Sequence, residues 1–347
     1  MGFTIRHHGV CVLLALVGVA GTGCLALPSF DIAKLHSAQQ LAEAWTHNFR
    51  QYNCSLRDEY EARPIGEDVA LWCFNRKSGK FRRTPNDLDD FSEVLQRNRS
   101  TVVFVHGWLQ GRMQFAGVVR LLALALPDRN YCLLDFETLA HAELDLFREQ
   151  LSPRIATFLA GLVQSLNAID IAPAQVTLVG EGVTAHLVGH TGSILSGRLG
   201  SIIALDPLGP FYTTGPVLPA KRLVLDASDA RFVQVWYSSI GQLGSPVPLG
   251  HQNIYVNGGL HPQPYCACFV KAFGSTSMLT QLCSHYFVVE VFKATLDPTT
   301  ALYATRCRSY KHFLAGHCEK QPAARISCDG TDAGHFYLET PCQPPFL

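Results

Sequence analysis

Histidine and cysteine are the residue types in this chain that could hold a metal, but their spacing argues against a metal site. His186 and His190 lie four residues apart, which would place two ligands on one face of a helix. No HExxH motif and no third ligand accompany them, so core or surface histidines are favoured. The triplet His141-Ala142-Glu143 resembles the start of a zinc-deaminase motif, but no Pro-Cys-x-x-Cys follows it. We therefore expect no metal and no cofactor.

The N-terminal residues are typical of a secretory signal peptide. Residues 6–8 are Arg-His-His, residues 10–20 form an apolar core, and residues 24–26 offer a small residue for cleavage. The apolar core is too short to span a bilayer. We expect cleavage after residue 26, a mature chain over 27–347, and a secreted, extracellular protein without a transmembrane segment.

The cysteine count fits disulfide bonds in an exported protein. Removing Cys11 and Cys24 with the signal leaves ten cysteines, and no paired C-x-x-C occurs. Seven of the ten follow residue 265, so the C-terminal third should be the most heavily cross-linked. Acceptor sequences for N-glycans at Asn53 and Asn98 fit the same secretory route.

Composition excludes two broad classes of protein. The 347 residues contain 28 Lys+Arg and 28 Asp+Glu, so the formal net charge is zero. Charged residues make up 16% of the chain and apolar residues 48%, which argues against a disordered chain. A nucleic-acid partner is not expected either, because no excess of basic residues is available to displace counterions from phosphates.

Short apolar runs alternate with longer helix-like segments along the chain. Because the expected strands are continuously apolar rather than alternating, they should be buried on both faces of a mostly parallel sheet flanked by helices, an α/β fold. The expected strands are 69–75, 101–106, 131–136, 176–180, 201–205 and 232–236, and the expected helices are 114–126, 144–167 and 183–196.

The segment 260–283 differs from these elements. It is rich in Gly, Pro, Ser and Thr and carries Cys266, Cys268 and Cys283. A cysteine-closed loop over the sheet edge would suit a lid, and an ordinary surface loop stapled for stability is an equally good interpretation.

Four short stretches share their order and spacing with one known family. Residues 101–108 end in His-Gly-Trp, and 176–186 have the form of a nucleophile elbow. Residues 203–210 include Leu-Asp-Pro-Leu-Gly-Pro, and 283–285 read Cys-Ser-His. Together they resemble the secreted neutral lipases of animals, the pancreatic-lipase-like branch of the α/β hydrolases. The resemblance runs from residue 68 to the C-terminus and implies an α/β-hydrolase fold.

The resemblance also implies a role for each site residue. In the family, an imidazole oriented by a buried carboxylate activates a serine, and backbone N–H groups stabilise the oxyanion. By position, Asp206 is the acid, His285 is the base, and Trp108 and Val183 are the oxyanion donors. Gly182 occupies the place of the serine, so nothing remains for the acid and base to activate.

Two further departures from the family pattern flank Gly182. Glu181 replaces the usual histidine and puts a carboxylate beside a turn that should favour developing negative charge. Thr184 replaces the second elbow glycine and adds a β-branched side chain where strand and helix approach closely. Gly182 itself would relieve the backbone strain that other residues suffer at such an elbow, provided that its φ is positive.

The resemblance extends to the C-terminal region. Residues 330–340 are similar to the closing strand of single-domain insect members, so no C-terminal β-sandwich domain is expected. The family implies a short disulfide between Cys307 and Cys318, and either Cys266 or Cys268 paired with Cys283 to close the lid.

These observations predict a catalytically inactive lipase-like protein that binds or carries a lipid, a fatty-acyl ligand or a protein partner. One alternative is an active secreted carboxylic ester hydrolase, either a triacylglycerol lipase or an sn-1 phospholipase. Another is a storage or structural protein, for which the lipase-like yolk proteins of Diptera are a precedent. The sequence leaves the oligomeric state open.

Overall fold

The computed structural model describes residues 31–51, 64–83, 94–216, 218–296, 302–318, 324–325, 332–344 and 346. The expected signal peptide, residues 1–26, and the glycan acceptor Asn53 lie outside the described residues. Asn98 is exposed at the end of the loop before the third strand and has a φ of 52°.

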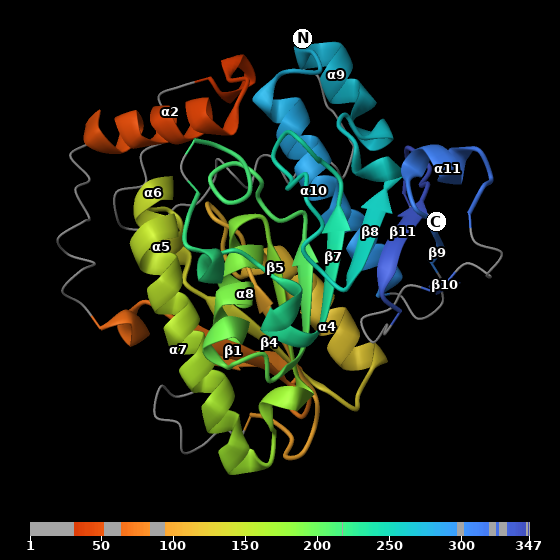
Figure 1. Cartoon of the computed structure of the whole chain (residues 1–347). Helices are drawn as coiled ribbons and strands as arrows, with labels where there is room; N and C mark the ends of the chain where they lie inside the picture. The colour runs from red at the N-terminus through yellow and green to blue at the C-terminus, as the bar shows by residue number, and fades with distance from the viewer. Residues whose placement is uncertain are drawn as a thin grey trace, which may run out of the picture.

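An eleven-stranded sheet forms the centre of the described structure (Figure 1). Its order is β10-β9-β11-β8-β7-β6-β5-β3-β4-β1-β2, and the seven strands from β11 to β4 pair in parallel. The remaining pairs, at the two edges, are antiparallel. The strands are β1 (Ala70–Asn75), β2 (Lys80–Arg83), β3 (Thr101–Val105), β4 (Asn130–Asp135), β5 (Val176–Glu181), β6 (Leu199–Leu205), β7 (Ala230–Tyr237), β8 (Gln252–Val256), β9 (Tyr303–Arg306), β10 (Ala324–Arg325) and β11 (Gly334–Leu338).

Helices cover both faces of this sheet, as the apolar strands predict. One hydrophobic core packs α5 (Glu137–Ala140), α6 (Leu144–Leu146), α7 (Ser152–Ser165) and α8 (Val183–Ile194) against one face. The other core packs α4 (Met113–Ala125) and α10 (Met278–Thr295) against the opposite face. The α/β class with a mostly parallel sheet is therefore confirmed.

Three further α-helices and several short turns complete the described structure. They are α2 (Ala38–Gln51), α9 (Ala267–Phe273), α11 (Tyr310–Leu314), the π-turn η4 (Phe147–Leu151), and the 3₁₀ turns η1 (Ile32–Lys34), η2 (Ile65–Glu67), η5 (Leu166–Ile169), η6 (Pro173–Gln175), η7 (Lys221–Leu223), η8 (Ala227–Asp229), η9 (Asn257–Gly259) and η10 (Pro264–Cys266). None of the described helices is both long enough and apolar enough to cross a bilayer.

The segment 260–283 is largely helical rather than a loop. It comprises η10, α9 and the first residues of α10, and its Gly and Ser residues fall in the short connections between them. The expected helix 144–167 is also different in detail, because the π-turn η4 separates α6 from α7.

Three disulfides cross-link the described residues, and two of them lie in the C-terminal part. Cys73–Cys132 joins the neighbouring strands β1 and β4. Cys307–Cys318 pairs as the family resemblance implies. Of the two possible partners for Cys283, the disulfide forms with Cys266, 17 residues away, whereas Cys268 carries an exposed free thiol. Cys342 is likewise exposed and free.

Candidate functional site

Gly182 lies in a sharp turn between β5 and α8, with φ 57° and ψ −116°. Its N–H donates to Leu205 O at 3.0 Å, and its carbonyl accepts from Leu208 N–H at 3.1 Å, so the turn is held from both sides. The φ is positive, as the strain-relief hypothesis requires. A Cβ placed on Gly182 would lie 3.0 Å from His285 Nε2. The missing side chain would therefore face the imidazole directly.

Asp206 and His285 form the carboxylate–imidazole pair of the site. Asp206 follows β6 and accepts from the backbone N–H groups of Ser238, at 2.8 Å, and Ser239, at 3.1 Å, and from the Ser239 hydroxyl. His285 projects from α10 and donates Nδ1–H to Asp206 Oδ2 at 2.7 Å. Asp206 is fully buried. This bond orients the ring so that Nε2 points toward Gly182.

Glu181 places a second carboxylate on the other side of the same ring. Its Oε1 lies 3.6 Å from His285 Nε2, and its Oε2 accepts a hydrogen bond from Gln114 Nε2 on α4. The side chain is 2% exposed. Burial raises the pKa of Glu181, against the opposing effects of His285 and the Gln114 bond.

Both carboxylates act on the proton affinity of His285. Burial alone would lower the pKa of the imidazole, but the hydrogen bond and charge of Asp206, together with the charge of Glu181, outweigh burial and raise it. A raised pKa favours the imidazolium, in which Nε2 carries a proton and cannot accept another. The charge of Glu181 therefore extends the pH range over which Nε2 carries a proton.

Thr184 is accommodated within the first turn of α8. Its hydroxyl donates to Glu181 O at 2.9 Å and accepts from Glu181 N–H at 3.1 Å, and the side chain is fully buried. These two bonds satisfy the hydroxyl and tie the end of β5 to the start of α8. The positive φ of Gly182 persists beside this β-branched residue.

The two expected oxyanion residues lie at the ends of different strands. Val183 is the first residue of α8, directly after the elbow, and Trp108 follows β3 in the loop that precedes α4. The Trp108 indole donates to Ala142 O at 2.9 Å, which fixes the loop against the chain after α5. Both residues line the same cavity as Gly182 and His285.

That cavity is small and mostly apolar. It has a volume of about 60 Å³, and its polar residues are Glu181, His285 and Tyr286. Leucines supply much of the wall, and the lining also includes Ala38 and Leu41 of α2, residues that the sequence did not single out. Leu41 is 8% exposed and belongs to the main core. The cavity is well below the 300–1,000 Å³ of a typical ligand site.

The N-terminal segment is anchored where it crosses this cavity. Leu35 O accepts from Met278 N–H at 2.6 Å, and His36 O accepts from Gln281 Nε2 at 2.8 Å. Figure 1 shows α2 lying across the end of the sheet where the parallel strands terminate, close to α10. Ala38 and Leu41 of α2 line the cavity, whereas from 260–283, for which the sequence left a lid and an ordinary stapled loop equally open, only Leu282 does.

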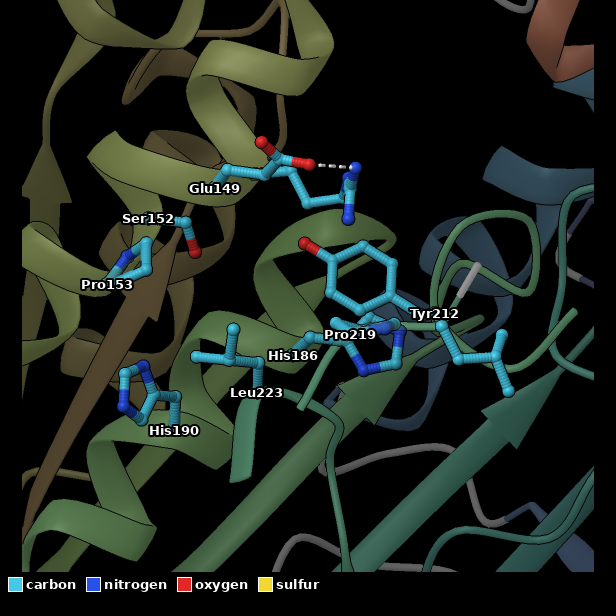
Figure 2. A pocket seen from close by; sticks show the side chains of 10 residues that line it. Glu149, Ser152, Pro153, His186, His190, Tyr212, Pro219 and Leu223 are labelled. Carbon is cyan, nitrogen blue, oxygen red and sulfur yellow. Dashed lines mark hydrogen bonds and ion pairs between the residues drawn. The ribbon is translucent and has the colours of Figure 1, made fainter. Parts of the chain in front are cut away.

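A second cavity of about 190 Å³ lies beside His186 and His190 (Figure 2). His186 donates Nε2–H to Leu208 O at 2.8 Å and accepts from Leu225 N–H at Nδ1, and its ring stacks on Tyr212. Burial lowers the pKa of His186 to about 4, so it is a neutral core histidine. No cluster of three potential metal ligands occurs among the described residues.

The elbow conformation generates a prediction for stability. We expect Gly182→Ala to lower the free energy of unfolding by about 1–3 kcal/mol, because an L-residue is strained at this φ and ψ and its Cβ would press on His285. Gly79→Ala is the control for strain without crowding, since Gly79 has φ +64° and open space around it. Urea unfolding monitored by circular dichroism measures both. A smaller loss for Gly182→Ala than for Gly79→Ala would contradict this account.

The buried Glu181 generates a prediction for pH. A carboxyl whose folded pKa is raised destabilises the fold once pH exceeds its ordinary value near 4.5, because the unfolded chain then ionises more readily. We expect Glu181→Gln and the parent to have the same free energy of unfolding near pH 4. At pH 8 the free energy of unfolding of Glu181→Gln should be higher by about 1–3 kcal/mol. Urea midpoints across this range measure the difference.

The matched control for that experiment is Glu339→Gln, which removes an exposed carboxylate. It is expected to change the free energy of unfolding by less than about 0.5 kcal/mol at either pH. A stability gain from Glu181→Gln that is the same at pH 4 and pH 8 would show that Glu181 is not the titrating group.

Comparison with known proteins agrees with this geometry. The family model described as Lipase matches residues 43–343. Human phospholipase A1 member A is 30% identical over 236 residues, covering 67% of this chain and 43% of that protein. Rat lipase member H is 31% identical over 251 residues, covering 70% of this chain and 50% of that protein. The chain thus spans about half the length of these relatives, or less.

Among solved structures, esterase PE8 is 17% identical, covering 47% of this chain and 70% of that one with a TM-score of 0.31. The strand–elbow–helix arrangement and the mostly parallel sheet are those of an α/β hydrolase. With the family match over most of its length, the chain belongs to the lipase family.

Proposed function

We propose that this protein is a secreted, catalytically inactive member of the lipase family that binds a lipid in the cleft above Gly182. The observation that carries the proposal is the absence of any side chain at the position facing His285 Nε2, where a Cβ would lie at 3.0 Å. Two disulfides in the C-terminal part support export from the cell.

Acyl transfer in this fold begins when a hydroxyl oxygen bonds to the carbonyl carbon of an ester. Gly182 offers no such oxygen, and the helix that follows it carries no serine within reach of the turn. Ser193 lies near the far end of α8, ten residues beyond Val183. Loss of a nucleophile costs on the order of a millionfold in turnover.

Glu181 is a second obstacle to hydrolysis. Its carboxylate lies 3.6 Å from His285 and helps to raise the pKa of the ring, so a serine restored at the elbow would face an imidazole that is protonated over a wider range of pH. It also adds negative charge close to where a tetrahedral oxyanion would form, which weakens the stabilisation by backbone N–H groups. The site therefore departs from an esterase in electrostatics as well as in its missing hydroxyl.

Retention of an apolar cleft supports lipid binding. The cavity above Gly182 is lined mainly by leucine, valine, tryptophan and alanine side chains. The related proteins are named for action on phospholipids and lipids, which suggests a lipid-like ligand for this chain as well. Ala38 and Leu41 of α2 line the cavity, so displacement of the buried Leu41 would enlarge the space available to an acyl chain.

An active carboxylic ester hydrolase is the second candidate. The intact hydrogen bond of 2.7 Å between His285 and Asp206 favours it, since this is the pairing that an esterase requires. The small volume of the cavity instead favours a storage or structural protein whose cleft stays filled.

A fluorophosphonate probe separates the inactive protein from the enzyme. We expect no covalent labelling of the parent protein and weak labelling at best of Gly182→Ser, because the charge of Glu181 helps to raise the pKa of His285 and so enlarges the fraction of rings that already carry a proton. Labelling should increase at least about tenfold in Gly182→Ser with Glu181→His, which restores both family residues. Labelling of the parent that is lost in His285→Ala would overturn the proposal in favour of an active hydrolase.

Native mass spectrometry of the secreted protein tests lipid binding directly. We expect a fraction of molecules to carry a co-purified lipid that is released on unfolding. Leu41→Gly, which removes a side chain from the cover of the cavity, should speed exchange of that lipid with added vesicles. No bound lipid, and no saturable uptake of a fluorescent lipid by either protein, would favour the structural alternative.

A further inference from the structure

At the Gly182 end of the cavity, Glu181 and His285 lie side by side, and Tyr286 is the third polar side chain of the lining. Glu181 Oε2 is engaged by Gln114, but Oε1 lies 3.6 Å from His285 Nε2, beyond hydrogen-bond distance, and keeps lone pairs for a donor. His285 Nε2 faces the place that a side chain on Gly182 would fill, at 3.0 Å. A ligand head group at this place therefore meets an imidazole nitrogen and a carboxylate together.

The three common lipid head groups differ in how they meet this pair. An ionised fatty acid would place its carboxylate beside Glu181, and like charges at such distances are costly where water is excluded. An ammonium head group has donors and no acceptor, so it cannot accept from an Nε2–H of His285, and it must also give up its hydration shell. A hydroxyl can donate to Glu181 Oε1 and accept from His285 Nε2–H, or donate to Nε2 when the ring is neutral.

We propose that the ligand of this cleft is a long-chain alcohol whose hydroxyl takes the place of the missing serine hydroxyl between His285 and Glu181. This inference rests on the proposed function, because it specifies the class of lipid that the cleft binds. It also gives Glu181 a role in specificity, as the group that rejects an ionised acid.

The surroundings provide room for the alkyl chain once α2 shifts. Ala38 lines the cavity above Gly182 and also a neighbouring groove of about 810 Å³. Ala42, Pro210 and Phe211 give that groove apolar surface. Displacement of Ala38 and Leu41 would join the two spaces, so that the hydroxyl lies at the elbow and the chain runs beneath α2.

Competition among three matched ligands tests the proposal. Dodecanol, dodecanoate and dodecylamine share one chain length and differ in head group, and each is titrated at pH 7.5 against the neutral dye Nile red bound to the full secreted chain. We expect dodecanol to displace the dye at a concentration at least about tenfold lower than either other ligand.

Substitutions at Glu181 and Gly182, with Glu339 as a control, test the role of each group. Glu181→Gln removes the charge but keeps an acceptor for Gln114, so dodecanoate should bind more tightly. Dodecanol should then displace the dye at a concentration less than about threefold lower than that of dodecanoate. Glu339→Gln, an exposed position that lines neither cavity, should leave the tenfold ratio unchanged. Gly182→Ser supplies the hydroxyl within the protein. It should raise the dodecanol concentration needed for displacement at least about tenfold, provided that circular dichroism shows a native fold.

The outcomes separate this inference from the function on which it rests. Equal or stronger displacement by dodecanoate or dodecylamine, or a ratio unaffected by Glu181→Gln, overturns the alcohol assignment and leaves lipid binding standing. No Nile red binding and no displacement by any of the three ligands overturns lipid binding itself, and the alcohol assignment with it.

Discussion

The left-handed turn at residue 182 is the constraint on which the site depends. It brings the end of β5, the start of α8 and the imidazole of His285 into contact, with φ 57° and ψ −116° at its centre. Any residue other than glycine is strained there, and such strain usually persists where a function requires it. The position is occupied by the one residue that adopts this conformation without strain, so the elbow keeps its shape without a nucleophile.

The chemical character of the site then follows from two carboxylates around one imidazole. In a serine hydrolase the ring has a carboxylate on one side and a neutral hydroxyl on the other, so its proton can move. Here Asp206 lies 2.7 Å from Nδ1 and Glu181 lies 3.6 Å from Nε2, and their combined charge stabilises the protonated ring. The proposed binding role uses this property, because a protonated Nε2 donates a hydrogen bond.

Much of this fold follows from the sequence, because the buried strands are continuous apolar runs. The expected strands 101–106 and 176–180 differ from β3 and β5 by one residue at their C-terminal ends. Edge strands such as β2 are short and exposed and carry no such signal. The helical form of 278–295 was not predicted, because α10 is apolar around most of its circumference and lacks a clear amphipathic period. The contacts of Gln114 with Glu181, and of Leu41 with the cavity, join segments far apart in sequence and left no local pattern.

Asp206 and His285 contribute to the stability of the fold as well as to the candidate site. Asp206 is fully buried, and the backbone N–H groups of Ser238 and Ser239, the Ser239 hydroxyl and His285 all donate to it and so compensate its charge. Removing one partner of a buried ionic pair typically costs about 3–5 kcal/mol, because the other charge stays buried without compensation. That cost is a large part of the 5–15 kcal/mol that separates a folded domain from its unfolded state. The stability that the Asp206–His285 bond contributes to the fold does not depend on a side chain at residue 182, so this pair and a glycine at the elbow are compatible in one folded structure.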